Sequence, residues 1–411
     1  MRKTVLFSIL DQVLVSGSMF ALNLLLILQG SPEAYGHFIL VLGLYFLAFG
    51  AQHAVILLPV NVLLPGKPHS RQNITLRMLS NIDLVLISVA ALLVGAMALA
   101  FELSIMLSLA GFGLVITMSA RELARTVFLT RQQPKRLIIL DAVFIAGTWL
   151  ALPLLWSSAQ PEEAATLALV IGNSLAFALA APKLYRRTRT LRRSWSRYSD
   201  YWRKSRWALV GAGLTEAQLR LYIFVVELAR GSAALGLLHA GRVIINPISM
   251  VAFAWCRAIR PMVALHLERQ EEPQAFRLIG ISMVGLLTFA VLYLLALYAA
   301  WPLLETRLFV NEGEAFARLV ALWAIFGMVN VPSIVLSIYL QAKHRYRDLT
   351  AITAISVTTS ALLLASLFFE VDLSLAIIAL LAGEAIMIVC LCAVLWFDVS
   401  AIRRGVRGAH V

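Results

Sequence analysis

The sequence predicts an all-α polytopic membrane protein of about twelve transmembrane helices, arranged as two six-helix bundles around a central cavity. Hydrophobic residues make up 61% of the 411 residues, charged residues only 14%, and the mean hydropathy is +0.85. These values lie outside the range of an ordinary soluble domain. Apolar runs of about 20 residues, the length of a membrane-spanning helix, also recur along the whole chain.

The apolar runs follow one another closely, and their short connections leave no room for a soluble domain. In the first half they cover residues 6–28, 36–62, 79–101, 104–128, 138–157 and 163–183. In the second half they cover residues 207–228, 232–256, 277–301, 315–341, 348–369 and 373–398. The first run follows basic residues, as in a signal peptide, but it is too long and lacks a small-residue cleavage pattern. It is therefore expected to remain as the first span.

The placement of the basic residues predicts the topology. With the N-terminus inside, 30 of the 35 Lys and Arg residues fall in or beside cytoplasmic segments, as the positive-inside rule requires. Both termini are then cytoplasmic. The same placement accounts for the net charge of +13 without a nucleic-acid partner.

A basic connection divides the chain into two halves. We expect an N-terminal six-helix bundle at residues 1–184, a cytoplasmic basic amphipathic linker at 185–206 and a C-terminal six-helix bundle at 207–411. In the linker, Trp195, Tyr198 and Trp202 share one helical face amid Arg and Lys. Such a face suits an interfacial helix on an anionic inner leaflet, although a merely topogenic charge run gives the same composition.

Three acids near predicted helix ends have two readings. Asp11, Asp83 and Asp141 fall in the first turns of spans, where the helix dipole favours negative charge. Transport chemistry is the alternative reading.

Three charges in the seventh span have no such explanation. Glu216 and Arg220 lie near its centre, four residues apart with the acid first, and Glu227 lies on roughly the same face. A charge at this depth costs on the order of 3 kcal/mol, so it normally faces a partner or a wet cavity. Either Arg220 is neutralised in a structural network, or it serves a ligand.

The eighth span carries Arg242 about half-way across the membrane, with His239 one turn before it and Asn246 and Pro247 after it. No acid lies within a turn of Arg242 along its helix. A proline inside a span bends the helix and frees a backbone carbonyl toward a cavity. Arg242 and Asn246 are therefore candidate ligand contacts.

Further polar side chains are candidates in other spans. Gln12, Gln52 and His53 could face the same central space from the first half, although a membrane histidine is more often a packing residue. Glu384 lies near the centre of the twelfth span without a basic neighbour in its helix. It is either a proton carrier or a protonated structural hydrogen-bond donor.

Motifs of several enzyme classes are absent from the sequence. It has no GxxxxGK[ST] phosphate loop, no HExxH, no paired CxxC and no GxSxG, so no cofactor, metal site or hydrolase activity is expected. The cysteines Cys256, Cys390 and Cys392 lie in apolar segments and act as small hydrophobic residues.

Three parts of the chain carry a family resemblance: the first two spans, "ARELARTVFLTRQQPKR" at the end of the fourth span, and "GSAALGLLHAGRVIINP" in the eighth. The positions that carry it are Gly17, Gly30, Pro32, Glu33, Tyr35, Gly36, Pro59, Gly236, Arg242 and Pro247. With these residues the segments resemble bacterial polysaccharide and O-antigen flippases of the multidrug/oligosaccharidyl-lipid/polysaccharide exporter (MOP) superfamily. A basic residue common at the end of that family's first span is missing here.

The resemblance implies a non-enzymatic carrier in the bacterial inner membrane that moves an isoprenoid-diphosphate-linked sugar outward. Arg220 and Arg242 would hold the diphosphate, with Glu216 and Glu227 pairing Arg220 in the empty site. The implied partners are the lipid-linked oligosaccharide, membrane lipids, a polysaccharide polymerase and glycosyltransferases. Two alternatives remain: a multidrug or cation antiporter of the same superfamily, and a non-transporting scaffold for polysaccharide assembly. Membrane potential and antiport through Glu384 remain alternative energy sources.

Overall fold

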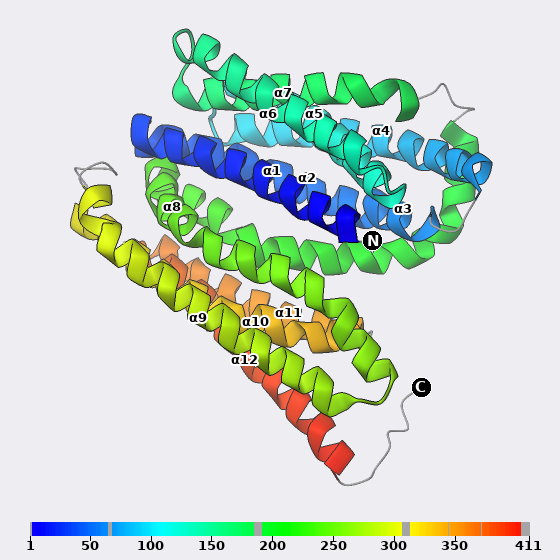
Figure 1. Ribbon diagram of the computed structural model, residues 1–411. Coiled ribbons are helices and arrows are strands. Elements are labelled where there is room, and N and C mark those ends of the chain that lie inside the picture. Colours follow the sequence, from blue (N-terminus) through cyan, green and yellow to red (C-terminus); the bar gives the residue numbers. More distant parts are fainter. Residues whose placement is uncertain are drawn as a thin grey trace. The chain divides into compact units, whose positions relative to one another are not determined.

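The structure is a computed structural model that describes residues 2–64, 68–184, 191–305, 313–343, 345–370 and 372–403. All regular structure in these ranges is helical, without any strand (Figure 1). The all-α class predicted from the sequence is therefore confirmed, and each predicted span falls on helical segments, two of them on one long helix.

The first half of the chain forms seven α-helices and one π-helical segment within the described ranges. They are α1 (Arg2–Gln29), α2 (Pro32–Gln52), η1 (His53–Leu57), α3 (Leu58–Leu63), α4 (His69–Ala100), α5 (Ile105–Thr130), α6 (Pro134–Trp156) and α7 (Pro161–Leu184). The sequence marks several of these starts. The hydroxyls of Ser31 and Ser104 cap α2 and α5 by accepting the N–H groups of Ala34 and Leu107, each at 3.1 Å.

The second half contains the longest helix. Its elements are α8 (Leu191–Glu268), α9 (Glu272–Glu305), α10 (Gly313–Ala342), α11 (Tyr346–Leu364), the 3₁₀ segment η3 (Ala365–Phe368) and α12 (Ser374–Arg403). Gly231 interrupts α8 with φ 81° and ψ 174°, a backbone conformation that glycine adopts at little cost. This break separates the predicted seventh and eighth spans.

The helices have the length and surface of membrane spans. Among the described residues, ten helices are long and apolar enough to cross a membrane, and a shorter apolar helix covers Leu14–Gln29. One of the ten, Leu209–Glu268, contains the break at Gly231. Large apolar side chains such as Leu150, Leu154 and Leu292 are 73%, 76% and 60% exposed, as expected for side chains that face lipid.

The chain forms two compact units. Unit 1 comprises Met1–Glu216 with Gly231–Gly236, and unit 2 comprises Ala217–Arg230 with Leu237–Val411. In unit 1, α5 and α6 both pack along α7, and in unit 2, α10 and α11 both pack along α12. The central cavity predicted between two bundles stays a prediction.

Two glycines from the resembling segments lie at a close helix crossing in unit 1. A Cβ on Gly36 would meet the carbonyl oxygen of Ser232 at 1.8 Å, and one on Gly236 would meet that of Pro32 at 1.8 Å. No side chain fits at either position without moving a backbone. The start of α2 and the short segment after the α8 break therefore touch backbone to backbone, as small residues permit between membrane helices.

Candidate functional site

The strongest candidate site lies around Arg242 in unit 2. Arg242 follows the break at Gly231 by about 16 Å of helix, close to half of a bilayer core. Its Nη1 donates a hydrogen bond to the carbonyl oxygen of Leu219, in the earlier part of the same helix, at 2.8 Å. Within the part of the chain that the structure describes, no carboxylate lies within ion-pairing distance of Arg242.

Two aromatic rings hold the Arg242 guanidinium. Its Cζ lies 5.1 Å from the ring centroid of Tyr222 and 5.5 Å from that of Trp323. Trp323, from α10, is almost fully buried, and its indole N–H donates to the carbonyl oxygen of Leu238 at 2.8 Å. Gly241 leaves room for this indole, because a Cβ there would lie 3.0 Å from Trp323. The rings orient the cation without neutralising its charge.

His239 completes this group. Its Nδ1 is hydrogen-bonded to the Tyr222 hydroxyl, and the two rings stack with centroids 6.1 Å apart. Arg220 and Arg242 both interact electrostatically with Tyr222 and His239. We call Arg220, Tyr222, His239, Arg242 and Trp323 the arginine–aromatic cluster. It brings two cations together, which is an arrangement suited to an anion, and Glu384 also interacts electrostatically with Arg242.

A second polar cluster in unit 2 surrounds Glu384. This carboxylate is 5% exposed, and its Oε1 accepts a hydrogen bond from Gln218 Nε2 at 3.0 Å. Gln218 also donates to the hydroxyl of Ser356 at 3.0 Å. Asn330 and Ser333 approach Glu384 as well, yet in the described part of the chain its buried Oε2 completes no hydrogen bond. A proton or small cation would satisfy this oxygen.

Unit 1 contains a closed charge cluster. Arg121 Nη1 donates to Asp141 Oδ1 at 3.1 Å and Arg121 Nη2 to Glu122 Oε1 at 3.1 Å. Arg125 donates to Asp141 Oδ2 at 2.8 Å and to Glu122 Oε1 at 3.2 Å. The Arg121 guanidinium lies 3.8 Å from the ring centroid of Phe144. Two arginines and two acids thus compensate each other.

The closed charge cluster corrects two expectations. Asp141 is the eighth residue of α6 and Asp83 the fifteenth of α4, so neither lies at a helix end, and both are buried. Arg121, expected beside a cytoplasmic loop, is only 1% exposed inside α5. The helix-end interpretation is therefore wrong for both acids. The side chain of Asp11 lies outside the described residues.

The remaining predicted residues of unit 1 separate into two environments. Gln52 is buried, and its Nε2 donates to Asp83 Oδ1 at 3.0 Å and to the carbonyl oxygen of Ser119 at 2.9 Å. His53 is exposed and interacts electrostatically with Glu216, whose side chain packs against Gly50. The structure thus brings His53 and Glu216 near each other and places Gln52 in a buried network.

The other candidates occupy separate positions. Glu227 is half-buried near the end of the first part of α8, and Asn246 is exposed on its second part. The side chain of Gln12 lies outside the described residues. The predicted site residues that come together in one cluster are Arg220 and Arg242.

Sequence reasoning missed the groups that orient the cations. Tyr222, Trp323 and Gln218 were not selected, because nothing in their own spans shows which side chain of another span they meet. Arg121 and Arg125 were counted with a cytoplasmic segment by the positive-inside rule. Their spacing around Glu122 was the available signal for a buried pair network.

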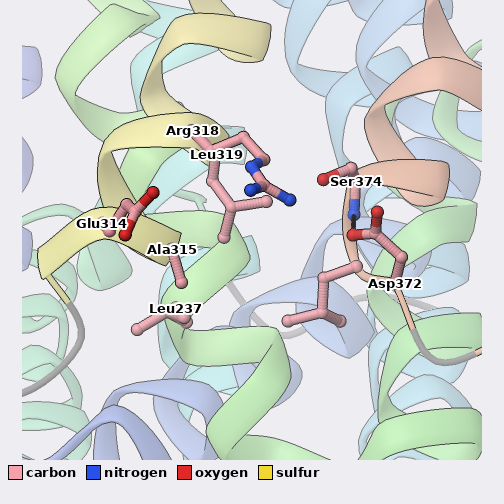
Figure 2. Close-up of a pocket in the computed structure, with 8 residues that line it drawn as sticks. Leu237, Glu314, Ala315, Arg318, Leu319, Asp372 and Ser374 are labelled. Carbon is pink, nitrogen blue, oxygen red and sulfur yellow. Dashed lines mark hydrogen bonds between the residues drawn. The ribbon is translucent and has the colours of Figure 1, made fainter.

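A pocket of about 490 Å³ lies in unit 2 where α10 and α12 begin. Figure 2 shows the Arg318 guanidinium pointing toward Asp372, whose carboxylate accepts the backbone N–H of Ser374 at 2.9 Å. Leu237, Ala315 and Leu319 supply apolar walls. None of the predicted site residues lines this pocket, so it is separate from the arginine–aromatic cluster.

Comparison with known proteins identifies the fold. The sequence matches no protein-family model and no curated protein. An inward-facing multidrug resistance MATE transporter of the MOP superfamily matches with a TM-score of 0.68, 11% identity and 96% of each chain covered. The lipid II flippase MurJ, in an inward closed conformation, matches with a TM-score of 0.67, 12% identity and 96% of this chain and 87% of that chain covered.

A third similar structure is described by the polarity of its binding pocket. It is a MOP superfamily transporter from Pyrococcus furiosus, reported to have a binding pocket of reverse polarity. Its TM-score is 0.61 at 12% identity, with 98% of this chain and 96% of that chain covered. The chain therefore has the polytopic fold of MOP superfamily transporters. At this identity the likeness concerns the fold, and membership in the polysaccharide flippases stays a prediction.

Proposed function

We propose that this protein is a flippase that moves an isoprenoid-diphosphate-linked oligosaccharide or polysaccharide unit across the bacterial inner membrane by alternating access. The observation that carries the proposal is the environment of Arg242. Its guanidinium is held by two aromatic rings and a backbone carbonyl at mid-membrane depth, without an acid in ion-pairing distance among the described residues. The shared fold with a lipid II flippase supports the same class of substrate.

The chemistry of the substrate explains why arginine is suited to this position. A diphosphate cannot cross hydrocarbon, so it needs donors that stay charged after desolvation. The planar guanidinium fork binds phosphate oxygens in pairs, and its pKa is too high for it to lose the proton. Tyr222 and Trp323 orient that fork in advance, and Arg220 supplies a second positive charge near the same rings.

A multidrug or cation antiporter is the second candidate, favoured by the similarity to MATE transporters. A cationic substrate would have to approach Arg220 and Arg242, and like charges repel strongly in a low-dielectric interior. The proposal therefore places the anionic substrate first. A non-transporting scaffold for polysaccharide assembly is the third candidate function. It would not need an arginine that can bind an anion.

The energy source is proposed from two features. An anion that moves outward across an inside-negative membrane gains about 2.3 kcal/mol per charge per 100 mV. The buried Glu384, with one oxygen free of hydrogen bonds in the described residues, is a candidate for ion coupling. We propose that potential moves the loaded carrier and that Glu384 couples the return step to a proton or cation.

The proposed location is the bacterial inner membrane, with both termini in the cytoplasm. A polysaccharide polymerase and glycosyltransferases are the proposed partners, because they would consume and supply the lipid-linked units. Surface labelling of single cysteines introduced near each end of the chain would test the topology. Labelling from the outer side at either terminus would overturn it.

Transport in proteoliposomes tests the function. A fluorescent isoprenoid-diphosphate-linked sugar is followed with the wild type, Arg242→Ala, Arg242→Lys and the matched control Arg318→Ala. A hydrogen bond to a charged group contributes about 1.5 to 3 kcal/mol, so Arg242→Ala should slow flipping about 10- to 100-fold. Arg242→Lys should recover part of this loss, because it keeps the charge without the fork.

Three outcomes would contradict the proposal. If Arg242→Ala flips the labelled lipid at the wild-type rate, Arg242 does not hold the diphosphate. If the wild type expels cationic dyes and does not flip the lipid, the antiporter reading replaces the flippase. If neither substrate moves, the protein is not a carrier of either class.

A further inference from the structure

The first turns of α8, Leu191–Arg206, form a helix fixed to unit 1, which we call the linker helix. Figure 1 shows that this start of α8 runs beside the N-terminal half of α4 before the helix continues into its long run. The Ser194 hydroxyl accepts a hydrogen bond from Asn81 Nδ2 of α4 at 2.9 Å. The Tyr198 hydroxyl donates to the carbonyl oxygen of Val55 at 2.7 Å. The linker helix is therefore anchored to α4 and η1 of unit 1.

Pro59 and a π-helical turn mark the segment that Tyr198 contacts. In an α-helix the carbonyl of Val55 would accept the backbone N–H of residue 59, and proline has none. The chain adopts a π-helical turn at His53–Leu57, which ends two residues before this proline. The Tyr198 hydroxyl donates a hydrogen bond to the Val55 carbonyl oxygen in this turn. A buried side-chain hydrogen bond thus joins the two segments.

The anchor corrects the expected aromatic face of the linker. Tyr198 is 0% exposed, so it binds protein rather than lipid. Trp195 and Trp202, seven residues apart and thus on one side of the helix, are 55% and 36% exposed. Tyr198 therefore fixes the linker helix to unit 1, while Trp195 and Trp202 remain exposed on the protein surface.

The charges of the linker helix complement an anionic membrane surface. Asp200 is the acid in this segment. Its basic residues are Arg192, Arg193, Arg197, Arg203, Lys204 and Arg206. Each Lys or Arg close to an anionic leaflet contributes about 1 kcal/mol of attraction, and indole rings favour the boundary between headgroups and acyl chains. Two exposed indoles in a segment of this composition are typical of a helix that lies in the interface plane.

We propose that the linker helix is a lipid-binding element that takes anionic phospholipid headgroups, with Trp195 and Trp202 in the interface. Tyr198 fixes its position to the π-helical turn that begins at His53. The lipid at this surface is a membrane component and not the transported substrate. The inference therefore does not rest on the proposed function.

Quenching of tryptophan fluorescence tests the lipid contact with the full-length protein in nanodiscs. The nanodiscs contain phosphatidylcholine and phosphatidylglycerol, and either lipid carries the bromine quencher in turn. The variants are the double substitution Trp195→Phe/Trp202→Phe and the control Trp396→Phe, which removes a 71% exposed indole of α12. Wild-type emission should be quenched more by brominated phosphatidylglycerol than by brominated phosphatidylcholine. This selectivity should disappear in the double variant, persist in the control and weaken with salt, because salt screens exposed charges.

Equal quenching by the two lipids in the wild type would overturn the proposal. It is also the result expected if an acidic protein, and not lipid, occupies this surface. Unchanged selectivity in the double variant would also overturn it. Tyr198→Phe tests the anchor separately, because it removes the hydroxyl and keeps the ring. Amide hydrogen exchange in residues 191–206 should rise at least several-fold while the preference for phosphatidylglycerol remains. Unchanged exchange would refute the anchoring role of Tyr198.

Discussion

The two units hold a membrane-embedded arginine in opposite ways. In unit 1, Arg121 is 1% exposed and bonded to two carboxylates, with Arg125 completing a neutral set. In unit 2, Arg242 is half-buried and held by two rings and a carbonyl oxygen. An arginine whose charge is matched by acids in hydrogen-bonding contact has a structural role. We propose that Arg242, which two rings and a carbonyl oxygen orient, keeps its charge for a ligand.

This difference also separates an arginine with a structural role from an arginine with a proposed role in binding. A buried ion pair contributes little net stability, but removing one partner leaves a charge without compensation. The closed charge cluster of unit 1 should therefore be sensitive to single substitutions. The arginine–aromatic cluster should tolerate loss of its cation and lose ligand affinity instead.

The largest expected effect is on the stability of unit 1. Arg121→Gln leaves Glu122 and Asp141 with only Arg125, and the free energy of unfolding should fall by about 3 to 5 kcal/mol. The midpoint of thermal unfolding in detergent measures the loss. The double variant Arg121→Gln/Asp141→Asn removes one charge of each sign and should recover most of it. If Arg242→Gln destabilises as much as Arg121→Gln, the contrast between the units is wrong.

The next effect is on the orientation of Arg242. Trp323→Leu removes a ring that faces the guanidinium, and cation–π contacts contribute about 0.5 to 2 kcal/mol. Affinity for the diphosphate lipid should therefore fall about 2- to 30-fold, as measured by titration of the purified protein. Trp301→Leu, at a half-buried position of unit 2, is the control and should bind normally. Equal losses in both variants would indicate general damage to the unit.

A more selective effect is expected at Glu384. Glu384→Gln keeps the shape and the hydrogen-bonding capacity of the side chain but cannot bind and release a proton. Stimulation of transport by an imposed ion gradient should be lost, while lipid affinity stays within about twofold. Transport rates in vesicles with and without the gradient provide the measurement. A fully retained gradient effect would leave the membrane potential as the energy source.

The smallest effect is expected at Asp372, an acid outside both clusters. The backbone N–H of Ser374 donates to its carboxylate and lowers its pKa, with a further contribution from the hydroxyl of Ser374. Its stabilising contribution is therefore present above the pKa of the unfolded chain and is lost as the pH falls through the folded pKa. Asp372→Ala should lower the free energy of unfolding by about 1 kcal/mol at neutral pH. Below the folded pKa of Asp372 it should not change that free energy. Unfolding midpoints across pH test this, and a constant difference would contradict it.

The membrane spans were predictable because each apolar residue adds to the hydropathy of its own segment. Twenty apolar residues and alternating basic loops define a membrane helix whatever it packs against. The cap at Ser31, the break at Gly231 and the prolines are local signals of the same kind. Arg242 was also accessible to sequence reasoning, because no acid lies near it in its own helix.

The partners of the charged residues were not predictable, because other helices provide them. Trp323 meets Arg242 from α10, and Asp141 meets Arg121 from α6. The positive-inside rule counts a basic residue near a span end and cannot tell whether its side chain turns inward. Similarly, the spacing of Trp195, Tyr198 and Trp202 predicted a common face, but the hydrogen bond to the carbonyl oxygen of Val55, from a segment distant in sequence, accompanies the burial of Tyr198.

Equilibrium binding of two matched lipids tests the central claim most directly. An isoprenyl diphosphate and the corresponding isoprenyl alcohol are titrated into the wild type and into Arg242→Gln. The wild type should bind the diphosphate at least about tenfold more tightly than the alcohol, because only the diphosphate engages the guanidinium. In Arg242→Gln this preference should largely disappear while the alcohol binds as before. An equal preference in both proteins would show that Arg242 does not hold a phosphorylated headgroup.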